Sequence, residues 1–177
     1  MRLHYLIPSL ILGVFVLTGC EGSKFPLSDP ADSVVDERIV GSWKFVGDDS
    51  DKASYVNIFA FNDREYYVET WEDGDEDELL RLNVFSTDID GIFFANMSCI
   101  NCDEDDDEPY IFVRYELVSD DELMVELIDD DEYDEIQELE SIDAVNYYVR
   151  KRMRENTFYD DEAGIYQRMD EEPVRGD

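Results

Sequence analysis

Short apolar segments rich in β-branched and aromatic residues recur along most of the chain. Asp, Asn, Gly and Ser separate them, at Asn62-Asp63, Asp90-Gly91 and Ser119-Asp120-Asp121 among other places. Such residues tolerate the tight or left-handed turns that β-branched residues disfavour. We therefore expect strands at 39–47, 54–61, 65–72, 79–86, 91–98, 110–118 and 122–128.

The alternation of apolar and polar residues is clearest late in this series. Ile111, Val113, Tyr115 and Leu117 share one face, while Arg114 and Glu116 share the other. Because side chains alternate across a strand, one face of this strand must be covered. Residues 55–61 are apolar on both faces, which predicts that the outer face of that strand is partly buried as well.

The pattern changes to a helical one near the C-terminus. Ile142, Val145, Val149 and Met153 recur at spacings of three or four after Ser141, a typical N-cap residue, so the sequence predicts an amphipathic helix over 141–156. Cationic side chains complement the negative end of the helix dipole, and this helix ends in Arg150, Lys151, Arg152 and Arg154. We expect these cations to pair within the acidic chain rather than with anionic headgroups. A segment at 164–169 could add a closing strand.

The first residues have the pattern of an export sequence. Arg2 precedes an apolar run from Leu6 to Leu17, which is typical of a secretory signal. A dozen residues are too few to span hydrocarbon, which takes about 20 residues. The run is therefore not expected to be the anchor.

The residues that follow, Leu17-Thr18-Gly19-Cys20, resemble the lipobox of bacterial lipoproteins. The resemblance implies that residues 1–19 are removed and that Cys20 carries a diacylglycerol and a fatty acyl group such as palmitate. Glu21 at the next position implies lipid anchoring in the outer membrane, on its periplasmic face, or in the cell membrane if the source has no outer membrane. Several acyl chains on one residue would hold the protein to a bilayer.

Residues 20–36 predict a lipidated tether. They are polar, contain Pro26, Pro30 and several serines, and show neither helical nor strand periodicity. Fully extended, such a segment would reach about 50 Å from the bilayer. We expect one domain over 37–170 and a tail over 171–177.

Charge narrows the range of partners. The chain has 14 Lys and Arg against 47 Asp and Glu, a net charge of −33, and its aromatic content of 13 % supplies a core. Such a charge excludes nucleic acid and bare anionic membrane surfaces as partners because their phosphates repel it. Adaptation to a salty medium is the simplest interpretation of the acidity, and binding of cations or basic proteins is the alternative.

Gly41-Ser42-Trp43, which opens the first expected strand, resembles the Gly-x-Trp signature of lipocalins. That resemblance implies an antiparallel up-and-down β-barrel, or a strongly curved sheet, with one C-terminal α-helix. It also implies that Trp43 plugs one end of the barrel beneath a late arginine, for which Arg168 is the candidate. The sequence departs from the family in lacking a clear Thr-Asp-Tyr motif. Residues 26–44 also resemble uncharacterised bacterial lipoproteins, which suggest no function.

The composition argues against catalysis. The one histidine, His4, lies in the signal region, so the mature chain lacks the usual base of serine and cysteine hydrolases and the commonest zinc ligand. A pair of carboxylates could act as general acid and base, as in glycosidases, but among 47 acidic residues such pairs occur by chance. We expect no catalytic residues and a protein that is not an enzyme.

Cys99 and Cys102 have C-x-x-C spacing. Outside the cytoplasm a local disulfide is the preferred interpretation. Redox activity is disfavoured because the acids that follow, Asp103 to Glu108, would raise the thiol pKa. A metal site would need further ligands.

Three acidic clusters are candidates for weak calcium binding through oxygen ligands. The alternative is that their carboxylates are simply solvated. Two of them supply the candidate ligands Asp73, Asp75, Asp77, Asp103, Asp105 and Asp107, and the third lies at 129–135. None is an EF-hand, since Glu78 stands where that loop needs glycine. No other cofactor is expected.

Two functions remain open for a non-enzymatic envelope lipoprotein. The barrel either encloses a small hydrophobic ligand, or it has a filled core and binds an envelope protein partner or has a structural role. An open apolar interior would favour the first.

Overall fold

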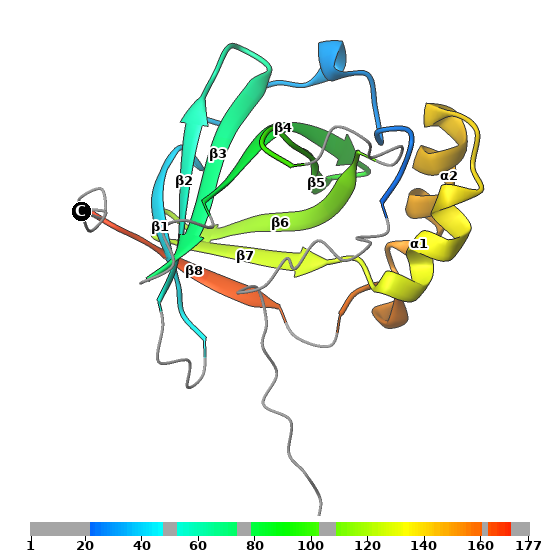
Figure 1. Cartoon of the computed structure of the whole chain (residues 1–177). Helices are drawn as coiled ribbons and strands as arrows, with labels where there is room; N and C mark the ends of the chain where they lie inside the picture. Colours follow the sequence, from blue (N-terminus) through cyan, green and yellow to red (C-terminus); the bar gives the residue numbers. More distant parts are fainter. Residues whose placement is uncertain (1–21, 48–52, 74–78, 103–108, 161–162, 171–177) are drawn as a thin grey trace, which may run out of the picture.

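The structure is a computed structural model that describes residues 22–47, 53–73, 79–102, 109–160 and 163–170. Eight antiparallel strands close into a barrel in chain order (Figure 1). The strands are β1 (Gly41–Phe45), β2 (Ser54–Ala60), β3 (Glu65–Glu72), β4 (Leu80–Ile89), β5 (Ile92–Cys99), β6 (Ile111–Ser119), β7 (Glu122–Leu127) and β8 (Gly164–Arg168). The predicted mainly-β, lipocalin-like barrel is confirmed, including the closing strand.

The barrel closes where β8 pairs with β1, with Arg168 opposite Trp43 in the register. Because every neighbour is antiparallel, the connections after β1, β3, β5 and β7 all leave one end, which we call the loop end. The short turns after β2, β4 and β6 lie at the opposite, turn end. Asp90 and Gly91 form one of these turns with φ values of 55° and 85°, a conformation that Asn, Asp and Gly adopt most readily.

Two hydrophobic cores result. The first lies inside the barrel and centres on Trp43, Tyr66, Val84, Leu123 and Tyr166. The second lies outside the barrel wall, where the outward-facing Phe94 and Phe112 are fully buried. Phe112 lies on the face of β6 that also carries Arg114 and Glu116, two polar residues that indicated exposure to solvent. The start of that face is therefore buried.

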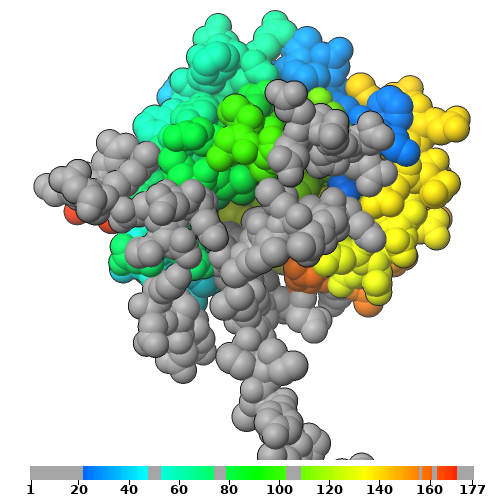
Figure 2. Space-filling model, viewed as in Figure 1, coloured from blue at the N-terminus to red at the C-terminus, as the bar shows by residue number. Residues whose placement is uncertain are grey.

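Two helices cover this outer core (Figures 1 and 2). Helix α2 (Ile142–Arg152) begins at the predicted N-cap, where the Ser141 hydroxyl accepts a hydrogen bond from the amide of Ala144 at 3.2 Å. It ends at Arg152 rather than at 156, and a 3₁₀ turn follows at Asn156–Phe158. Helix α1 (Asp130–Gln137) was not predicted, because its acidic first turn was interpreted as a loop. In the described ranges, no helix combines the length and apolarity needed to cross a membrane.

The prediction of a free tether over 20–36 is wrong for the described residues of that segment. Residues 22–40, which we call the strap, start beside α2 and cross to the turn end of the barrel, where Val35 and Asp36 contact Asp63 and Tyr66 (Figure 1, blue). The strap includes a short 3₁₀ turn at Pro30–Asp32 and ends with Ile39 in the inner core. Leu27 is fully buried in the outer core, and its amide donates to Asn96 Oδ1 at 2.7 Å. Ser23 pairs with Tyr110 through two backbone hydrogen bonds of 2.8 and 3.1 Å. The compact domain therefore includes residues 22–36 as well.

Candidate ligand site inside the barrel

The turn end is plugged by the fully buried Trp43, whose indole Nε1 donates to the carbonyl of Ile39 at 2.9 Å. The structure brings Trp43 and Arg168 together, with the guanidinium carbon 4.2 Å from the ring centroid. Arg168 also donates to the carbonyls of Asp120 at 2.7 Å and Val40 at 2.9 Å, and to that of Arg38. These contacts fasten the start of β1, the end of β8 and the β6–β7 turn to one another.

Gly41 is required beneath this arginine. Its φ is 136°, which residues with a Cβ rarely adopt, and an added Cβ would lie 2.8 Å from Arg168 Nη1. The glycine and the tryptophan of the Gly-x-Trp sequence therefore both serve the packing of Arg168.

Polar groups inside the turn end are paired with one another. The hydroxyls of Ser86 and Tyr115 lie 2.7 Å apart, and the Tyr66 hydroxyl accepts from the amide of Asp36 at 2.6 Å. Burial raises the pKa of Tyr66, Tyr115 and Tyr166, so these phenols stay neutral at ordinary pH. The hydrogen-bonded phenols of Tyr66 and Tyr115 stabilise this end of the barrel, and none of the three phenols offers a charged group to a ligand.

Apolar side chains line the interior toward the loop end. Several of them are only partly buried, and we call these the loop-end set: Phe45, Val56, Leu80, Met97, Cys99 and Val125. Leu82 among them is buried, and Val40 and Leu117 toward the turn end are partly buried as well. The loop-end set thus leaves part of its apolar surface exposed, whereas Trp43 and Arg168 cover the turn end.

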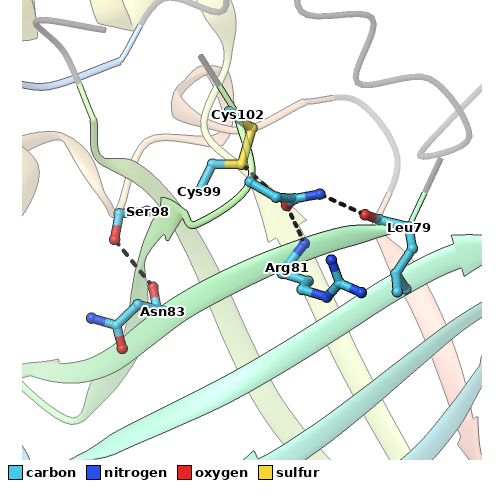
Figure 3. Close-up of a disulfide and its surroundings, with 7 residues drawn as sticks. Leu79, Arg81, Asn83, Ser98, Cys99 and Cys102 are labelled. Carbon is cyan, nitrogen blue, oxygen red and sulfur yellow. Dashed lines mark hydrogen bonds between the residues drawn. A yellow bond between two sulfur atoms is a disulfide. The ribbon is translucent and has the colours of Figure 1, made fainter. Parts of the chain in front are cut away.

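A disulfide joins Cys99 to Cys102 at the rim of the loop end (Figure 3). Between them, the Asn101 side chain accepts from the amide of Arg81 and donates to the carbonyl of Leu79, both at 2.8 Å. Asn101 thereby takes the place of a backbone partner for the first residues of β4. The disulfide loop holds the edge of the β4–β5 pair in place, a role that the C-x-x-C spacing alone did not indicate.

Five of the six candidate calcium ligands lie outside the described residues: Asp75, Asp77, Asp103, Asp105 and Asp107. Asp73 directly follows β3 at the loop end, where its amide donates to the carbonyl of Ala53 at 2.8 Å. Among the residues that the structure describes, no group of three metal-ligating side chains occurs. Calcium binding stays a prediction.

Three of the four cations at and just after the end of α2, Arg150, Arg152 and Arg154, pair within the chain. Arg152 contacts Glu132 at 2.5 Å and Glu155 at 2.6 Å, and Arg150 and Arg154 lie 3.5 and 3.7 Å from Asp90. The hydroxyl of Tyr148 donates to Glu132 as well, at 2.8 Å. This network fastens α2 to α1 and to the β4–β5 turn, as expected for few cations in a highly acidic chain.

Cys20, the predicted site of acylation, lies outside the described residues. The strap contacts made by Ser23 and Leu27 were missed, because proline- and serine-rich composition conceals partners that are distant in sequence. The only hint was the apolar pair Phe25 and Leu27 within a polar segment.

Comparison with known proteins adds no relative: no family model, no curated protein and no solved structure matches the chain.

Proposed function

We propose that this chain is an exported, non-enzymatic envelope protein, acylated on Cys20 and anchored to the outer membrane, whose barrel binds a small uncharged apolar ligand through its loop end. Where the source has no outer membrane, the anchor lies in the cell membrane. The closed eight-stranded antiparallel barrel is compatible with ligand binding of the lipocalin kind.

The partial burial of the loop-end set is the observation that carries the ligand proposal. A barrel with a filled core would bury its inward-facing residues along its whole length. Met97, Leu80 and Val56 instead face inward with part of their surface exposed. Burying such surface contributes about 25 cal/mol per Å², so an apolar ligand gains affinity by covering it.

The charge of the chain favours an uncharged ligand. The connections that join the strands at the loop end include Gly74–Glu78 and Asp103–Glu108, which are almost entirely acidic in sequence. An anionic headgroup entering from this side would be repelled. We therefore expect neutral apolar molecules to bind more tightly than fatty acid anions of the same chain length.

Two methionines of the barrel wall give a matched test. Met97 belongs to the loop-end set, and Met124 on β7 points to the outer face. Binding of N-phenyl-1-naphthylamine, an uncharged apolar fluorophore, is titrated on the domain without its lipid. We expect saturable binding that Met97→Trp weakens at least tenfold by filling the interior and that Met124→Trp leaves within twofold. Absent binding, or equal affinities for both variants, would contradict the proposal.

The anchor is tested separately. Intact-mass analysis of native material should show a chain that begins at Cys20 with acyl groups attached, and Cys20→Ser should leave the membrane fraction. An unmodified N-terminus would refute the anchor without affecting the ligand proposal.

A further inference from the structure

The distance between the predicted anchor and the folded domain is short. Gly22 is buried and Ser23 is bonded to Tyr110, so only Glu21 and Gly22 lie between Cys20 and a fixed point of the barrel. Three extended residues span at most about 11 Å. A lipid on Cys20 therefore has little freedom to reorient the domain.

That fixed point lies at the loop end. Tyr110 immediately precedes Ile111, the first residue of β6, and β6 runs from the loop end to the turn end. Its nine residues extend about 30 Å, or roughly 20 Å along the barrel axis when strands are tilted at about 45°. The turn end is thus beyond the reach of an anchor at Cys20.

We infer that the anchor, which rests on the function proposed above, holds the loop end against the lipid leaflet, so that the mouth of the barrel faces the bilayer. The apolar lining then meets its ligand at the membrane surface, and the turn end points away. Val46 and Ile100 are exposed at the loop end, by 49 % and 54 %, and would contact the headgroup region.

The acidity of the loop end indicates which lipid headgroups it can contact. Acidic connections at the loop end repel anionic lipids, so the contact suits zwitterionic headgroups. The turn end is acidic as well, since its turns carry Asp63, Asp88, Asp90, Asp120 and Asp121, and Arg38 there is paired with Asp36 at 2.7 Å. Surface charge therefore does not distinguish the two ends, and the short tether alone selects the loop end.

The test places one bimane label at either end of the acylated protein. The three cysteines of the chain are then occupied, Cys20 by lipid and the other two by the disulfide, so that Val46→Cys or Phe61→Cys adds a single free thiol. Both positions are exposed, so labelling leaves the core intact. The proteins are reconstituted into phosphatidylcholine vesicles that contain a nitroxide-headgroup lipid.

We expect the label at position 46 to be quenched at least twofold more than the label at position 61, and partial replacement by phosphatidylglycerol to reduce the difference. Equal quenching, or stronger quenching at position 61, would overturn the inference. A 20-residue Gly/Ser insertion between Glu21 and Gly22, with a root-mean-square length of about 25 Å, should abolish the difference. A difference that survives the insertion would overturn the tether as its cause.

Two separate measurements report whether the proposed function itself fails. Intact mass reports acylation before reconstitution, and binding of the naphthylamine probe to the lipid-free domain reports the ligand site. An acylated, probe-binding protein without the quenching difference would refute only the orientation.

Discussion

The guanidinium of Arg168 lies 4.2 Å from the ring centroid of Trp43, at the position where the last strand of the barrel meets the first. Residues 125 positions apart in the chain thereby share one contact, and three backbone carbonyls depend on the same guanidinium. Arg168 therefore reinforces the backbone pairing of β1 with β8 that closes the barrel.

Replacing that side chain should destabilise the whole barrel. Arg168→Ala removes the cation–π contact and leaves the partly buried carbonyl of Val40 without this donor. We expect the substitution to lower the free energy of unfolding by about 2 to 4 kcal/mol in urea titrations. Gln167→Ala, at an exposed neighbour on β8, is the control and should change it by less than about 0.5 kcal/mol. Equal effects would show that Arg168 is not a fastening residue.

The packing of the strap predicts that truncating one aliphatic side chain lowers the stability of the whole domain. Leu27→Ala should cost about 2 to 4 kcal/mol of unfolding free energy, because Leu27 is fully buried in the outer core. Val34→Ala on the same segment is the matched control, since Val34 is 75 % exposed. If both substitutions proved neutral in chemical denaturation, residues 22–36 would be a free tether after all.

The disulfide loop makes a third prediction. Closing four residues contributes about 2 kcal/mol in the chain-entropy model, so reduction should lower the stability by about that amount. Asn101→Ala should cost about 1 to 2 kcal/mol with the disulfide intact, because the amide of Arg81 and the carbonyl of Leu79 lose their partner. Ile100→Ala, at an exposed position in the same loop, serves as control in thermal and urea unfolding.

The Glu132 network predicts the response of stability to acid. Burial alone would raise the pKa of Glu132, but hydrogen bonds from Arg152 and Tyr148 outweigh burial and hold this pKa below its ordinary value. A carboxylate with a lowered pKa contributes stability above its unfolded pKa, near 4.3, and loses it as the pH falls through the folded pKa. We expect Glu132→Gln to destabilise at pH 7 by about 1 to 3 kcal/mol, and the difference from the original chain to shrink below pH 4.

The acid prediction is checked by urea midpoints measured from pH 7 to pH 3. Glu155→Gln is the control, because Glu155 also contacts Arg152 but is far more exposed. A Glu132→Gln difference that stays constant with pH would contradict the ionic character of the network.

Much of the barrel could be predicted from local pattern. Turn residues such as Asp90-Gly91 and the alternation around Val113 are properties of neighbouring positions, so the predicted strands agree with β1 to β7 to within about three residues at each end. The pairing of Trp43 with Arg168 came only from the Gly-x-Trp resemblance, since no local pattern joins residues so far apart.

The strap and α1 could not be predicted in this way. Helix α1 offers only Tyr133 and Ile136 as buried apolar positions among acids, too few for a periodic pattern. Leu27 finds its partner Asn96 at a separation of 69 residues, and its neighbours have the composition of a linker. These segments are ordered by tertiary contacts rather than by the intrinsic secondary-structure propensity of their residues. The partly exposed lining of the interior likewise depends on barrel geometry rather than on any motif.

The meeting of β1 and β8 also dictates when the protein can fold. Contacts such as those of Arg168 with Val40, and of Asn146 with Leu27, span more than a hundred residues. Such distant pairing makes folding slow, because a long loop must close before the contact forms. In the export proposed above, the N-terminus would cross the membrane first, so Trp43 would emerge long before its cover does. The barrel could then close only after its final strand had been delivered.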